Sequence, residues 1–212
     1  MEYIQPDEHV FICGQTGTGK SKVAEIYLAG ADAVVKLDTK GEYYERRKKG
    51  EPAWHGLVEG RDYTVITKLA DIDKAQTDKI IYVPDHDELN EEHYDALMGW
   101  IYKRENTILW IDELMEVCPS PTKYPANLKA LYTRGRSKEA TVWACTQRPS
   151  DIPSVCFGQS THFFIFTMQL PQDRKKLMDS TGMPQFWEQP SGHYFWYWRI
   201  GAEEPVKAIL RF

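Results

Sequence analysis

The sequence lacks long hydrophobic runs and has no excess of positive charge. No stretch approaches the roughly 20 apolar residues that a transmembrane helix needs, and residues 1–7 show neither the basic start nor the apolar core of a signal peptide. The net charge of −5 at pH 7 argues against a monomer that binds nucleic acid through an overall basic surface, although a ring could still collect positive charge in a central pore. We therefore expect a soluble intracellular protein without a membrane span.

Cysteine is also scarce. The four cysteines, Cys13, Cys118, Cys145 and Cys156, form no C-x-x-C pair and show no spacing typical of a zinc site, so they indicate reduced thiols. With 42% hydrophobic residues among 212, the chain can bury a substantial core. Because no linker, repeat or low-complexity tract interrupts it, we expect a single domain over residues 1–212.

One segment matches the phosphate-binding loop pattern G-x-x-x-x-G-K-[ST]. Its residues are Gly14, Gln15, Thr16, Gly17, Thr18, Gly19, Lys20 and Ser21. An apolar run precedes the loop and a helix-like run follows it, and in that context backbone N–H groups and a helix start bind a polyphosphate. Lys20 would reach the β- and γ-phosphates, and the Ser21 hydroxyl would ligate Mg²⁺. The segment predicts binding of ATP and Mg²⁺; a glycine-rich turn is the alternative.

A second pattern places two carboxylates at the end of an apolar strand. Residues 107–111 are followed directly by Asp112 and Glu113. Beside a phosphate loop, Asp112 would hold the Mg²⁺ shell and Glu113 would orient and deprotonate the attacking water. Taken alone, Asp-Glu after a strand is also a common start of a helix.

Two further segments carry polar or basic side chains. Gln147 follows another buried strand, where it could bond both the γ-phosphate and the water; a polar strand-to-turn transition is the alternative. Arg134 and Arg136 lie at the basic end of a helix, a position that also favours positive charge for purely structural reasons.

Strands and helices alternate along the chain, which predicts an α/β fold. Strands are expected at residues 9–13, 33–37, 63–67, 79–83, 107–111, 141–145 and 161–166, and helices at 19–29, 88–104, 126–138 and 172–180. Apolar strands without alternation indicate a mainly parallel sheet sandwiched by helices. Residues 193–200 and 205–212 predict a C-terminal antiparallel hairpin on the sheet edge.

Four motifs in this order resemble the FtsK/HerA superfamily of DNA-translocating ATPases. They are the phosphate loop, the segment 34–42 ending Asp-Thr-Lys-Gly-Glu, the Asp-Glu pair, and Gly135-Arg136 followed by Thr-Gln-Arg-Pro at 146–149. Thr39 departs from the superfamily, in which proline is usual at this place. The resemblance implies a RecA-like P-loop NTPase fold, assembly into a ring that is usually a hexamer, and sequence-independent translocation of double-stranded DNA. It also implies that Arg136 is an arginine finger for a neighbouring subunit's site, with Arg134 as the competing candidate.

The length of the chain indicates which members of the superfamily it resembles. Because 212 residues leave no room for the extra domains of FtsK, HerA or conjugative coupling proteins, the chain is most similar to the genome-packaging ATPases of internal-membrane, double-jelly-roll DNA viruses. Such a motor would work in the host cytoplasm or at the packaging vertex of the virion, anchored to a capsid-vertex or viral membrane protein. A filamentous-phage assembly ATPase and a HerA-like translocase are alternatives. A monomeric nucleotide-dependent switch or small-molecule kinase is an alternative of another class.

DNA contacts have two candidate segments. Residues 46–49, Arg-Arg-Lys-Lys, are the densest basic run, but such a run is more often a solvated loop. The proline-rich loop 117–124 contains Lys123 and is an equal candidate for a projecting pore loop.

Overall fold

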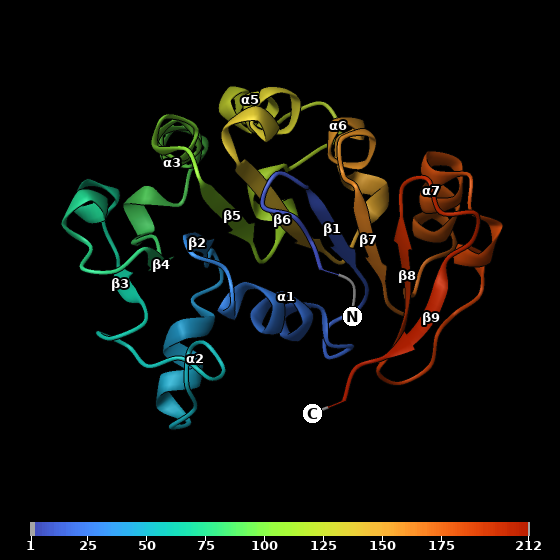
Figure 1. Ribbon diagram of the computed structural model, residues 1–212, viewed down its shortest axis with the longest axis horizontal. Coiled ribbons are helices and arrows are strands. Elements are labelled where there is room, and N and C mark those ends of the chain that lie inside the picture. Colours follow the sequence, from blue (N-terminus) through green and yellow to red (C-terminus); the bar gives the residue numbers. More distant parts are fainter. Residues whose placement is uncertain (1–2, 212) are drawn as a thin grey trace.

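The chain folds around one mixed sheet in the computed structural model, which describes residues 3–211 (Figure 1). The strands are β1 (Val10–Cys13), β2 (Val34–Leu37), β3 (Thr64–Ile66), β4 (Lys79–Tyr82), β5 (Thr107–Ile111), β6 (Ala140–Thr146), β7 (His162–Ile165), β8 (Tyr194–Arg199) and β9 (Val206–Ile209). They lie in the order β3-β4-β2-β5-β6-β1-β7-β8-β9. Strands β1 to β7 pair in parallel, and β8 and β9 add an antiparallel hairpin beside β7.

Helices cover both faces of this sheet. They are α1 (Lys20–Ala29), α2 (Glu42–Lys48), α3 (Glu91–Arg104), α4 (Leu114–Val117), α5 (Ala126–Arg134), α6 (Ser154–Gly158) and α7 (Pro171–Thr181). Short 3-10 helices are η1 (Leu69–Lys74), η2 (His86–Glu88), η3 (Arg136–Lys138), η4 (Pro149–Asp151) and η5 (Pro184–Trp187). In Figure 1, α1 and α2 lie on one face and α3, α5 and α6 on the other.

The predicted α/β architecture is confirmed. Every predicted strand is present with small shifts at its ends, and the central strands are buried along their whole length, as expected for a parallel sheet covered on both faces. The predicted hairpin is also present as β8 and β9; its last predicted residue, Phe212, lies outside the described residues.

Two predicted helices have different ends from those expected. Helix α3 begins at Glu91 rather than at residue 88, because the Asn90 side chain accepts the backbone N–H of His93 and caps it there. Helix α5 ends at Arg134, and a Cβ atom at Gly135 would lie 2.1 Å from the carbonyl oxygen of Ala140. The chain therefore turns tightly at Gly135 and enters β6 through η3.

The alternative of a solvated loop at residues 46–49 is wrong about the loop, because residues 46–48 belong to α2, although residues 47–49 are exposed to solvent. This helix begins at Glu42, directly after Gly41, whose φ of 69° suits glycine. Both oxygens of the Asp38 carboxylate accept N–H groups of its first turn, from Glu42 and Tyr43. Within the run, Arg46 is half-buried by its own chain rather than extended into solvent.

Two hydrophobic clusters fill the fold, one on each face of the sheet. The outer faces of the helices carry the charged residues, so the sheet is held between two apolar layers. Among residues 3–211 there is no helix of sufficient length and hydrophobicity to span a lipid bilayer.

Candidate nucleotide site

The phosphate loop joins the end of β1 to the start of α1, as predicted. The loop is fixed at its base by two backbone bonds, from Gly14 N–H to the Thr146 carbonyl (3.2 Å) and from Gln15 N–H to the Thr167 carbonyl (2.8 Å). Gly14 has a φ of 152°, and a Cβ atom there would lie 2.5 Å from the Cβ of Phe166. Only glycine therefore allows the loop to pass this close to the neighbouring strand end.

Lys20 lies across the loop that it is predicted to serve. The residue is buried, with 7% of its surface exposed, and its Nζ donates to the Gln15 carbonyl at 2.9 Å. Burial lowers the pKa of Lys20 below its ordinary value, although the carboxylates of Asp112 and Glu113 oppose that shift. When a nucleotide binds, this ammonium group can replace its bond to the Gln15 carbonyl by bonds to phosphate oxygens.

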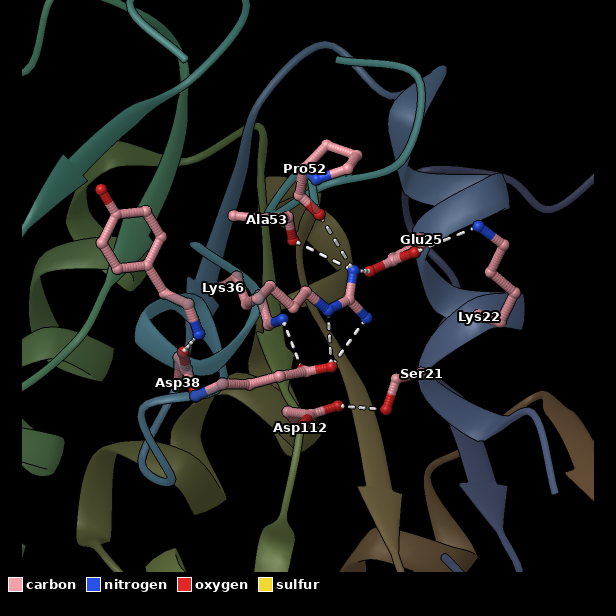
Figure 2. A network of polar contacts seen from close by, with 11 residues as sticks. Ser21, Lys22, Glu25, Lys36, Asp38, Pro52, Ala53 and Asp112 are labelled. Carbon is pink, nitrogen blue, oxygen red and sulfur yellow. Dashed lines mark hydrogen bonds and ion pairs between the residues drawn. The ribbon is translucent and has the colours of Figure 1, made fainter. Parts of the chain in front are cut away.

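The predicted magnesium ligands are in contact. The Ser21 hydroxyl donates to Oδ1 of Asp112 at 2.8 Å, which joins the start of α1 to the end of β5 (Figure 2). Burial raises the pKa of Asp112, and the charge of the nearby Lys36 opposes that shift. Hard oxygen donors suit Mg²⁺, which in such sites takes one or two protein groups and completes its shell with phosphates and water. The described residues include no cluster of three or more His, Cys, Asp or Glu that would hold a metal without phosphate.

Glu113 is a buried carboxylate held by two hydrogen bonds. It is 4% exposed, and its Oε2 accepts Lys40 Nζ at 2.8 Å and Gln147 Nε2 at 2.9 Å. Gln147 is fixed in turn, because its Oε1 accepts the Thr16 hydroxyl at 2.9 Å. The other oxygen of Glu113, Oε1, is buried and has no hydrogen-bond partner among the described residues. An anchored carboxylate with one unused oxygen can accept a proton from a water molecule.

These groups surround one cavity of about 440 Å³. Its lining consists of Thr16, Gly17, Gly19, Lys20, Ser21, Lys22, Lys40, Glu42, Glu45, Asp112, Glu113 and Gln147. A larger cavity of about 730 Å³ lies at the opposite edge of the sheet, between the first described residues and α1, but it contains none of the predicted site residues. The chemistry therefore lies in the smaller cavity.

A buried ionic network forms the wall of the site next to Asp112. Lys36 on β2 is 1% exposed, donates to the Glu42 carboxylate at 3.1 Å and lies 4.4 Å above the ring of Trp110. Burial alone would lower the pKa of Lys36, but the surrounding carboxylates, Asp112 first among them, raise it above its ordinary value. Lys36 therefore stays charged beneath the site.

Arg46 continues this network to α1. Its guanidinium bonds Glu42 at 2.7 Å and also contacts Glu25, which is fully buried and lies one turn beyond Ser21 (Figure 2). The same guanidinium reaches the carbonyls of Pro52 and Ala53. The network thus fixes α2 against α1 and holds the loop that carries Lys40.

Known structures have this architecture. The genome packaging NTPase of Sulfolobus turreted icosahedral virus 2, solved with ATP-gammaS, has a TM-score of 0.72 at 16% identity, covering 98% of both chains. The DNA-packaging ATPase of Sulfolobus turreted icosahedral virus has a TM-score of 0.72 at 18% identity, over 96% of this chain and 98% of that one. VirB4 of Thermoanaerobacter pseudethanolicus has a TM-score of 0.64 at 12% identity, over 99% of this chain and 93% of that one. The chain therefore shares the fold of these proteins.

Beyond the four short motifs, the sequence as a whole has no such match. No protein-family model matches it, and no curated protein is significantly similar to it. The likeness therefore lies in the three-dimensional arrangement of the strands and helices.

The two predicted arginines lie away from this site. Arg134 and Arg136 precede β6, whereas Gln147 follows it, and seven residues of strand place them roughly 20 Å apart. The Arg136 Nε donates to the Asp7 carbonyl at 3.0 Å, and the Arg134 guanidinium lies 5.8 Å from the ring of Tyr102. The structure therefore does not bring either arginine to the nucleotide site of its own chain.

Lys40 and Glu42 are site residues whose individual roles were not predicted from the sequence. Both belong to the segment Asp-Thr-Lys-Gly-Glu, which was notable only for its resemblance to the superfamily. Strands β2 and β5 are parallel neighbours, with Leu37 paired to Ile111. Because the carboxyl ends of parallel neighbours meet at one edge, this pairing could have placed Lys40 beside Glu113.

Proposed function

We propose that the chain is an ATP-hydrolysing translocase of double-stranded DNA that works as a ring of identical subunits, in the role of a viral genome-packaging motor. The observation that carries the hydrolytic part is the position of Glu113, a buried carboxylate with one unused oxygen in the cavity of the phosphate loop. The packaging role is supported by the near-complete overlap with two viral packaging enzymes.

Each residue of the site has a part in the proposed reaction. Ser21 and Asp112 would hold Mg²⁺, which would supply positive charge to offset that of the β- and γ-phosphates. Glu113 Oε1 accepts a proton from water as the water oxygen bonds to the γ-phosphorus and the bond to the β-phosphate oxygen breaks. Gln147 and Thr16 keep the carboxylate turned toward that water.

The ring is supported by the position of Arg136. It is exposed at the opposite edge of the sheet, so it can complete a nucleotide site only on another subunit. We propose a hexamer, as is usual in this superfamily, anchored at a capsid vertex or to a viral membrane protein, in the host cytoplasm or the virion.

The DNA contact is proposed at the loop 117–124 rather than at α2. Arg46 is engaged by Glu25 and Glu42, whereas the Lys123 side chain is 66% exposed and has only a long contact of 3.6 Å to Glu91. An exposed lysine on a stiff loop can follow a phosphate backbone without reading its sequence.

Phosphate release and particle mass, measured together, test this proposal. We expect turnover per chain to rise with protein concentration and with added double-stranded DNA of any sequence, and light scattering to show a ring when nucleotide is present. Full turnover by a monomer, insensitive to DNA, would contradict the proposal and support the monomeric switch. Phosphate transfer to a small molecule instead of water would support a kinase.

A further inference from the structure

Lys40 occupies a position in the cavity that the proposed reaction does not yet use. Its Nζ lies 2.8 Å from Glu113 Oε2, and both side chains line the space in front of the phosphate loop. The two partners differ in exposure: the Lys40 side chain is 44% exposed, whereas that of Glu113 is 5% exposed. In this ion pair, the lysine is the partner that can move.

The geometry of hydrolysis brings two negative groups together at this point, and a cation there can reduce their repulsion. An attacking water must lie within hydrogen-bond reach of Glu113 and about 3–3.5 Å from the γ-phosphorus. The γ-phosphate and Glu113 are then two anions on either side of one water molecule, and they repel each other. A cation bonded to Glu113 is within roughly 6 Å of the γ-phosphate, a distance that a change of lysine rotamer can cover.

The other lysines of this region already have partners of their own. Lys20 belongs to the phosphate loop itself, and Lys36 is buried between Glu42 and Trp110. Lys22 pairs with Glu25 on the same helix, α1, at 3.5 Å (Figure 2).

We propose that Lys40 recognises the γ-phosphate of a bound nucleoside triphosphate and pairs with Glu113 until that phosphate replaces the carboxylate as its partner. The inference rests on the proposed function, because it assigns a ligand to the same site. It makes Lys40 the residue that distinguishes a triphosphate from a diphosphate. On this proposal, Glu113 loses its bond to Lys40 only when a γ-phosphate is present. Glu113 then keeps its hydrogen bond from Gln147.

Equilibrium binding of AMPPCP and ADP with Mg²⁺ tests the inference without hydrolysis, DNA or a ring. In the Lys40→Met protein we expect AMPPCP to bind about ten-fold or more weakly, because a charge-assisted hydrogen bond is lost, while ADP binds as in the wild type. Lys40→Arg should keep part of the preference for the triphosphate. Lys49→Met, at an exposed position just beyond α2, is the matched control for loss of one lysine and should change neither affinity.

Each other outcome overturns the inference in a recognisable way. Equal losses for AMPPCP and ADP would assign Lys40 a structural role, and thermal unfolding would then show whether the fold is weakened. Unchanged binding of both ligands would leave Lys40 as a partner of Glu113 alone. A wild-type protein that binds neither ligand would overturn the proposed function itself, and the Lys40 inference with it.

Discussion

The two edges of the sheet hold their charged side chains in different ways. At the edge where the parallel strands end, Ser21, Asp112 and Glu113 are joined to partners within 2.9 Å and lie in or beside a buried network. At the edge where strands begin, the Arg136 side chain is 51% exposed and lies 3.9 Å from the carboxylate of Asp7. The groups proposed to act within one chain are buried or half-buried and bonded within the site, whereas the group proposed to act on a neighbour is half exposed and bonded to the backbone carbonyl of Asp7.

Removal of Lys20 should cause the largest effect, because its ammonium is the positive charge inside the phosphate loop. We expect Lys20→Ala to abolish turnover and to weaken triphosphate binding about a hundred-fold, since charge-assisted bonds to two phosphates are lost. Titration with a fluorescent nucleotide measures this. Lys49→Ala should bind normally, and normal binding by Lys20→Ala would contradict the assignment of the loop.

Arg136→Ala tests the opposite edge. If a neighbour supplies this guanidinium, hydrolysis should fall by about 10³–10⁵, while nucleotide binding stays close to that of the wild type. Arg134→Ala should lower the hydrolysis rate much less. The comparison of the two variants decides which arginine acts on the neighbouring site. Phosphate release at a fixed subunit concentration provides the measurement.

Mixed rings make the test of Arg136 sharper. In a mixture of Arg136→Ala and Lys20→Ala chains, some interfaces combine an intact Lys20 with an intact Arg136 from the next subunit. Activity should then reappear although each protein alone is inactive. If the two proteins co-assemble and the mixture stays inactive, Arg136 does not act across a subunit interface.

Glu113→Gln should keep nucleotide and Mg²⁺ binding but lower hydrolysis by about 10²–10⁴, because an amide cannot accept the proton of the water. The amide can still bond Lys40 and Gln147, so the site should keep its shape. Single-turnover phosphate release separates this effect from binding. Wild-type turnover in the Glu113→Gln protein would remove Glu113 from the mechanism.

Much of this edge could be predicted from the sequence, because parallel strands bring their ends together. Asp112, Glu113 and Gln147 follow buried strands, and the loop that ends in Ser21 follows another, so their order in the sequence was enough to predict that they meet. The roles of Arg134 and Arg136 stay predictions, since they depend on a second chain.

The wall of the site could not be predicted in this way. Lys36 lies within a strand whose other residues are apolar, and only the fold brings Glu42 and Trp110 to its ammonium group. Helix α2 is short and rich in charge, so its own sequence favours solvent; the Asp38 cap and the contact of Arg46 with Glu25 stabilise it. Both depend on tertiary contacts that local patterns do not contain.

Arg46→Met measures how much that wall contributes to stability. The change leaves the fully buried Glu25 with Lys22 at 3.5 Å as its remaining ionic partner, so we expect a loss of about 3 kcal/mol in the free energy of unfolding. Chemical denaturation measures it. Arg47→Met is the control, because Arg47 is the next residue and is exposed. It should lower the free energy of unfolding far less. Equal losses would mean that the Glu25 contact contributes little.

The last expected effect concerns the edge where the strands begin, which contains a buried ionic contact around Glu8. Glu8 precedes β1, and its carboxylate bonds His162 Nε2 at 2.8 Å and the Arg199 guanidinium at 3.0 Å, which ties the N-terminal segment to β7 and β8. Burial would raise the pKa of Glu8, but these bonds and the Gln5 N–H outweigh it and lower the pKa from 4.5 to about 2.

A depressed folded-state pKa stabilises the protein above the unfolded-state value, and that stability is lost as pH falls. We therefore expect Glu8→Gln to be less stable than the wild type at pH 7, and the difference in urea midpoint to shrink as pH falls from 4.5 towards 2. Glu203→Gln, in the exposed turn between β8 and β9, should show no such trend. A difference between Glu8→Gln and wild type that stays constant down to pH 2 would show that the carboxylate charge is not what holds this edge together.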